Sequence, residues 1–77
     1  MSYEWRRDRA MRLILWLKEL EADYVYEREE GDILAAEAKY ESMNRWYAEL
    51  KKLGIEAYTL ADAEQTFRRI YGAPKKG

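Results

Sequence analysis

The chain contains no cysteine and no histidine. Without cysteine, no disulfide can brace the fold and no thiolate can bind a metal ion. Without histidine, the sequence lacks the commonest general base and the commonest metal ligand. The hydroxyl side chains Ser2, Ser42, Thr59 and Thr66 have no recognisable base beside them in a catalytic pattern. We therefore expect a protein that is not an enzyme and that carries no cofactor and no metal.

Long apolar runs are also missing. The longest run, residues 13–17, is far too short to cross a bilayer. The charged pair Lys18 and Glu19 follows it where a signal peptide would need small residues. The sequence contains no linker and no repeat, and its single proline, Pro74, lies near the end. These features predict one cytoplasmic domain over residues 1–77, with a flexible tail at 73–77 and no membrane or small-molecule partner.

Neither sign of charge is in large excess. Fourteen basic and fifteen acidic residues leave a net charge of −1, which weighs against binding nucleic acid through bulk positive charge. Asn44 and Gln65 are the only amide side chains in a sequence that is 38% charged. This balance is typical of a thermophilic protein or of a de novo designed helical bundle, and the design remains one alternative.

What the chain does contain is two apolar stripes at alternating steps of three and four residues, the a/d spacing of a coiled-coil seam. The first comprises Ala10, Leu13, Leu17, Leu20 and Tyr24, and the second comprises Ile33, Ala36, Tyr40, Met43, Tyr47 and Leu50. The stripes are mirror images about the turn near Gly31, so they match layer by layer when the segments run antiparallel. Small residues then meet large ones, as in Ala36 with Tyr24.

The phase of the stripes breaks at Gly31, which predicts a helical hairpin rather than one long rod. Gly31 permits a left-handed turn conformation, and Asp32 is a good N-cap for the next helix. We expect the two helices at about 3–29, capped by Ser2, and at about 33–53, ended by Gly54.

A shorter third helix is expected at about 60–71. Thr59 is its N-cap, Asp62 stands at the capping-box position, and Gly72 ends it. The fold class is therefore all-α, a three-helix bundle made of a long antiparallel hairpin and a short third helix.

Helical periodicity places Trp5 and Trp16 on one flank of the first stripe and Trp46 on the same-sign flank of the second. When two helices pack antiparallel, the flanks that lie at the same angular sign from each stripe face the same side of the pair. We therefore expect a tryptophan-lined groove on that side, filled by the third helix through Leu60, Phe67 and Ile70.

The opposite flank and the back of the hairpin would then stay uncovered, although they carry many apolar side chains. Exposed apolar surface of this kind usually marks a partner site. We expect a protein–protein interaction module, an adaptor, inhibitor or assembly protein of the sort that phages also carry, which self-associates or docks on a larger protein. The expected interface residues are Met11, Ile14, Leu15, Ala22, Val25, Tyr26, Leu34 and Ala38.

Two further groups of residues suggest other roles. Leu53, Gly54 and Ile55, followed by Thr59 and Leu60, resemble the turn of a helix-turn-helix DNA-binding motif. That resemblance implies a DNA-binding accessory protein using residues 54–69, but Asp62 and Glu64 would repel phosphate at the reading end of the helix. The expected nucleic-acid contacts are Arg68 and Arg69 of this segment and, in a separate basic cluster near the start of the chain, Arg6, Arg7 and Arg9. The second group, Glu27, Glu29, Glu30 and Asp32, is expected to be a solvated acidic turn.

Overall fold

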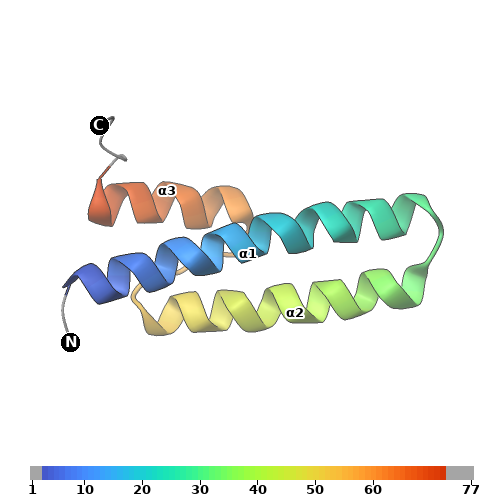
Figure 1. The fold of residues 1–77 in the computed structure, drawn as a ribbon, viewed down its shortest axis with the longest axis horizontal. Helices are drawn as coiled ribbons and strands as arrows, with labels where there is room; N and C mark the ends of the chain where they lie inside the picture. Colours follow the sequence, from blue (N-terminus) through green and yellow to red (C-terminus); the bar gives the residue numbers. More distant parts are fainter. Residues whose placement is uncertain (1–2, 73–77) are drawn as a thin grey trace.

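The computed structural model describes residues 3–72, which form three α-helices and no strand. They are α1 (Tyr3–Glu29), α2 (Ile33–Lys52) and α3 (Leu60–Tyr71). Helices α1 and α2 form the antiparallel hairpin, and the shorter α3 lies beside α1 at the end away from the turn (Figure 1). The predicted all-α three-helix fold is confirmed. Ser2 and the tail at 73–77 lie outside the described residues.

The hairpin turn forms where the stripes change phase. Gly31 has a φ of +81°, in the left-handed region that favours glycine. Its N–H donates to the carbonyl of Arg28, and the N–H of Asp32 donates to the carbonyl of Glu27 at 2.9 Å, which together form a Schellman motif. The Asp32 carboxylate then accepts a hydrogen bond from the N–H of Ala35 and caps α2. The predicted break at Gly31 is confirmed.

The seam between α1 and α2 is the main core. Leu13, Leu17 and Leu50 are completely buried, and Met43 is nearly so. These residues come from the two predicted stripes, and all of them lie in the half of the hairpin away from the turn. At the turn end the stripe residues Ile33 and Tyr40 remain more than half exposed.

Helix α2 ends one residue earlier than expected, at Lys52, with Leu53 as its C-cap. Gly54, with a φ of +88°, donates to the carbonyl of Lys51, and Ile55 donates to that of Leu50. This is a second Schellman motif, and its hydrophobic partners Leu50 and Ile55 are both completely buried. The link from Ile55 is thus anchored in the core before it reaches α3.

Helix α3 begins with the predicted capping box, in which Thr59 accepts a hydrogen bond from the N–H of Asp62 and the Asp62 carboxylate accepts one from the N–H of Thr59. It runs antiparallel to α1, because Glu64 pairs with Lys18 at 3.2 Å and Tyr71 packs on Tyr3 with ring centroids 5.1 Å apart. Helix α3 therefore covers α1 only as far as Lys18.

The expected position of α3 over the tryptophan groove is wrong. Helix α3 packs on the opposite flank of α1, where Ile14 is only 7% exposed and Ala63 is completely buried. Trp16 and Trp46 do lie on one side of the hairpin, as predicted, with ring centroids 5.2 Å apart. The two indoles pack against each other on that side, and α3 packs on the other flank.

The contact stripe of α3 differs from the expected one at a single position. Leu60 and Phe67 pack against the core as predicted, but Ile70 is 43% exposed. Tyr71 takes its place, because its ring packs against Phe67 at 4.9 Å and against Tyr3.

Candidate interaction surfaces

The predicted partner surface divides into a covered part and an exposed part. Ile14 is buried and Met11 is half-buried because both lie against α3, so the expectation that they stay uncovered is wrong. Leu15 lies at the edge of the groove between α1 and α3 and is 53% exposed. The other five predicted residues are all exposed.

The exposed part gathers in the half of the hairpin next to the turn. Leu34 is 81% exposed, more than any other leucine described, and Val25 and Tyr26 are also exposed. The structure adds Ile33 and Tyr40, which sequence reasoning had placed in the seam. No sequence signal distinguishes these two from the buried stripe residues, since their exposure depends on how far α3 extends. The turn surface, as we call it, comprises Ala22, Val25, Tyr26, Ile33, Leu34, Ala38 and Tyr40.

A shallow groove of about 260 Å³ runs between the two helices in this region. Ile33, Ala36 and Tyr40 line it on α2, and Tyr24 and Arg28 line it on α1. The Arg28 guanidinium donates a hydrogen bond to the Tyr24 hydroxyl at 3.2 Å. Tyr40 also borders the cleft beside the α2–α3 link. The groove therefore lies on the same side of the hairpin as this link.

Charge is strongly segregated along the hairpin. Residues 19–41, around the turn, contain nine acidic and two basic residues, a net charge of −7. Residues 3–18, at the other end of α1, contain two acidic and five basic residues, a net charge of +3. The near-zero net charge of the chain therefore conceals a large dipole along its long axis. The turn surface lies entirely within the acidic half.

The second exposed surface is the flank opposite α3, which we call the tryptophan face. Its centre is the Trp16–Trp46 pair, with Arg9 over the Trp16 ring at 5.9 Å. Nearer the turn, Lys39 and Asp23 form an ion pair across the seam at 3.5 Å. The face comprises Trp5, Arg9, Arg12, Trp16, Leu20, Asp23 and Glu27 of α1 and Ala35, Lys39, Ser42, Trp46, Glu49 and Leu53 of α2, which share one flank by helical periodicity.

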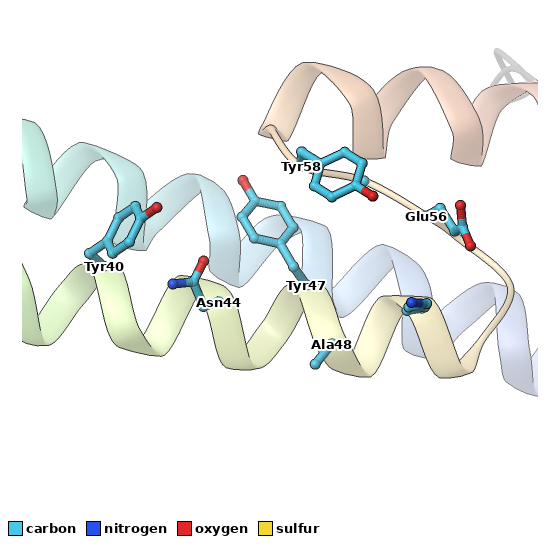
Figure 2. Close-up of a pocket in the computed structure, with 8 residues that line it drawn as sticks. Tyr40, Asn44, Tyr47, Ala48, Glu56 and Tyr58 are labelled. Carbon is cyan, nitrogen blue, oxygen red and sulfur yellow. The ribbon is translucent and has the colours of Figure 1, made fainter.

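A polar cleft of about 350 Å³ lies beneath the α2–α3 link (Figure 2). Tyr40, Asn44 and Tyr47 line it from α2, while Glu56 and Tyr58 belong to the link. Burial, with smaller effects from Glu21, Asp62 and Tyr40, raises the pKa of the Tyr47 phenol above 10.0. Tyr47 therefore stays protonated at neutral pH.

The residues of the nucleic-acid alternative come from two helices, and both groups lie at the end of the molecule away from the hairpin turn, where Tyr71 packs on Tyr3. Arg68 and Arg69 are exposed near the end of α3, Arg6 is exposed, and Arg7 and Arg9 are half-buried on α1. A helix-turn-helix crosses its two helices at a large angle. Here α2 and α3 run in the same general direction, and α3 packs on α1 rather than on α2 (Figure 1).

Among residues 3–72, no helix combines the length and the apolar character needed to cross a membrane, and no cluster of acidic side chains could hold a metal ion. Comparisons with protein-family models, with curated proteins and with solved structures found no match to this chain.

Proposed function

We propose that this protein is a non-enzymatic interaction module whose turn surface docks a helix of a partner protein. The observation that carries the proposal is the exposure of large apolar side chains where α3 no longer covers the hairpin. Five of them, Val25, Tyr26, Ile33, Leu34 and Tyr40, are each 47–81% exposed. A helix packed along the flank of the groove would bury Val25, Ile33 and Tyr40, with Leu34 at its edge, at about 25 cal/mol per Å² offset by the cost of association.

The charge around the turn surface indicates the chemistry of the partner. With a net charge of −7 over residues 19–41, an acidic partner would be repelled and a basic one attracted. An amphipathic helix with one apolar face and flanking lysines or arginines matches both properties. Residues 19–29 of α1, which α3 leaves uncovered, span roughly 16 Å, so about three helical turns of the partner would be in contact.

A model peptide tests the proposal directly. A labelled helical peptide with a leucine face and a lysine face is expected to bind the full chain, and the same peptide with glutamate in place of lysine is expected not to bind. Leu34→Ser and Val25→Ser should each weaken binding several-fold, because each removes an apolar contact. Leu15→Ser is the matched control, since Leu15 is 53% exposed, close to the 47% of Val25, but lies outside the turn surface. Equal binding of both peptides, or equal effects of Leu15→Ser and Leu34→Ser, would contradict the proposal.

DNA binding is the weaker candidate, because Asp62 and Glu64 stand in the first turns of α3, where a recognition helix would approach phosphate. We expect no mobility shift of duplex DNA at low salt. A shift that disappears in the Arg68→Ala and Arg69→Ala variants would favour this alternative instead.

A further inference from the structure

The tryptophan face lies on the flank that α3 does not cover, in the middle of the hairpin. Trp16 is 37% exposed and Trp5 is 48% exposed, and Trp46 is partly exposed beside Trp16. Partly exposed tryptophans backed by a packed core are typical of the centre of a protein interface. This face is separate from the turn surface, so a role for it does not depend on the proposed function.

One pair of charges of α1 on this face is arranged symmetrically about Trp16, with opposite signs. Basic Arg9 stands seven residues before Trp16 and acidic Asp23 stands seven residues after it. Arg12, four residues before, is matched by Leu20, four residues after. A second α1 laid antiparallel across this face would therefore place each Arg9 against the Asp23 of the other copy.

Helix α2 repeats the arrangement with the signs reversed, centred on Asn44. Lys39 stands five residues before Asn44 and Glu49 stands five residues after it. The antiparallel stripes place Asn44 at nearly the same height along the hairpin as Trp16. One twofold axis at that height thus pairs opposite charges on both helices.

The sizes of the side chains on α2 follow the same symmetry. Ser42 and Trp46 stand two residues on either side of Asn44, and Ala35 and Leu53 stand nine residues on either side. Across the axis a small side chain would thus meet a large one at these two levels, as close packing favours.

We propose that a second copy of this chain binds the tryptophan face, antiparallel, about a twofold axis at the level of Trp16. The two hairpins then form a four-helix bundle in which α1 packs on α1 and α2 packs on α2 of the other copy. Each α3 stays on the outside, because it occupies the opposite flank of α1. The Trp16–Trp46 pairs of both copies meet at the centre.

Charge also selects the direction of pairing. A twofold axis parallel to the helices would place the turns together and superpose two regions of net charge −7. The antiparallel arrangement sets each acidic turn half against the half of the other copy that begins with the +3 segment at residues 3–18.

The available area is sufficient for a stable dimer. A face two helices wide and about 20 residues long measures roughly 30 by 20 Å. Treated as flat, it covers on the order of 600 Å² per copy, and protruding side chains add to this area. Specific interfaces bury about 600–1,000 Å² per partner.

Sedimentation of the full chain at tens of micromolar tests the proposal, and a dimer is expected. Arg9→Glu should weaken dimerisation about tenfold, since it creates two like-charge contacts per dimer. Adding Asp23→Arg should restore dimerisation, less the small contribution of the Asp23–Lys39 ion pair that this second change removes. Arg69→Glu on α3 is the matched control, and circular dichroism shows whether each variant is folded. A monomer at this concentration, or no rescue in the folded double variant, would overturn the proposal.

The orientation is tested separately. Because the chain has no cysteine, a single Glu30→Cys substitution allows a spin label to be placed at the turn. The antiparallel dimer predicts a label-to-label distance of roughly 40 Å, set by the length of α1 beyond Trp16 in both copies. A distance below about 20 Å would show the turns side by side and would overturn this arrangement. Leu34→Ser should leave the dimer intact, so a failure of this interface is distinguishable from a failure of the turn surface.

Discussion

The two halves of the hairpin are built from the same kind of stripe, but they differ in what covers them. In the half away from the turn, α3 and the link add a third layer, and Leu13, Leu50 and Ile55 are completely buried. In the turn half only two helices meet, and Ile33 and Tyr40 of the same stripe stay more than half exposed. A two-helix seam has one buried line, whereas a third element is needed to close a core.

The halves also differ in charge, and this difference affects which surfaces can associate. The half with the closed core begins with the basic segment at residues 3–18, while the open half carries the net charge of −7. Like-charge repulsion keeps two open halves from pairing with each other. Under the proposed function, the exposed apolar side chains of the turn half bind a partner of opposite charge.

The largest expected effect contrasts one leucine from each half. Leu17→Ala should lower the free energy of unfolding by about 3 kcal/mol, because Leu17 is completely buried and its removal leaves a cavity. Leu34→Ala should change it by less than about 0.5 kcal/mol, because Leu34 is 81% exposed. Urea unfolding monitored by circular dichroism measures both. Equal losses would contradict the contrast between a closed and an open half.

The next prediction asks whether the two halves unfold together. Gly31→Ala and Gly54→Ala each force a side chain into the left-handed region, at φ values of +81° and +88°, with open space around the added carbon. The cost is backbone strain alone, about 1 to 2 kcal/mol for each. Equal losses in urea unfolding indicate one cooperative unit. A loss confined to Gly54→Ala would show that the turn half opens independently of the core.

A smaller effect is expected from the cap of α3. Thr59→Ala removes the oxygen that accepts from the N–H of Asp62 and should cost about 1 kcal/mol. Hydrogen exchange should show the loss most clearly in the amides of α3. Thr59→Ser keeps the oxygen and serves as the control. Unchanged exchange in α3 after Thr59→Ala would mean that packing on α1 alone holds the helix.

The smallest effect concerns pH. The raised pKa of Tyr47 means that, in alkali, the unfolded chain loses the phenol proton before the folded protein does. The contribution of Tyr47 is therefore fully present below about pH 10, the ordinary tyrosine pKa, and falls as the pH rises through the folded-state value. Stability measured from pH 8 to 11 should decline less steeply in Tyr47→Phe than in the unchanged chain. Superimposable profiles of stability against pH for the two proteins would contradict this prediction.

Much of the fold was predictable because its signals are local. The two glycines that end α1 and α2, the Asp32 cap and the Thr59–Asp62 capping box act within a few residues, and each was found where it was expected. The position of α3 was not predictable in the same way. Both flanks of α1 are apolar, one through Ile14 and the other through Trp16, so periodicity alone gives no preference between them.

The candidate surfaces follow from that choice. Placing α3 over Ile14 removed Met11 and Ile14 from the predicted surface and left the tryptophan face open. The exposure of Ile33 and Tyr40 could not be foreseen either, because it depends on α3 ending its cover of α1 at Lys18.

By itself, the sequence determined, to within one residue, where the helices end and which residues form the seam away from the turn, because caps, left-handed glycines and the 3–4 spacing act at short range. Only the tertiary structure decided which flank of the hairpin is covered. Trp16 packs against Trp46 on one flank, and the buried Ile55 packs in the core and anchors the link that returns to the other side. Both are contacts between residues far apart in the chain, and their energies depend on a geometry that no single segment contains.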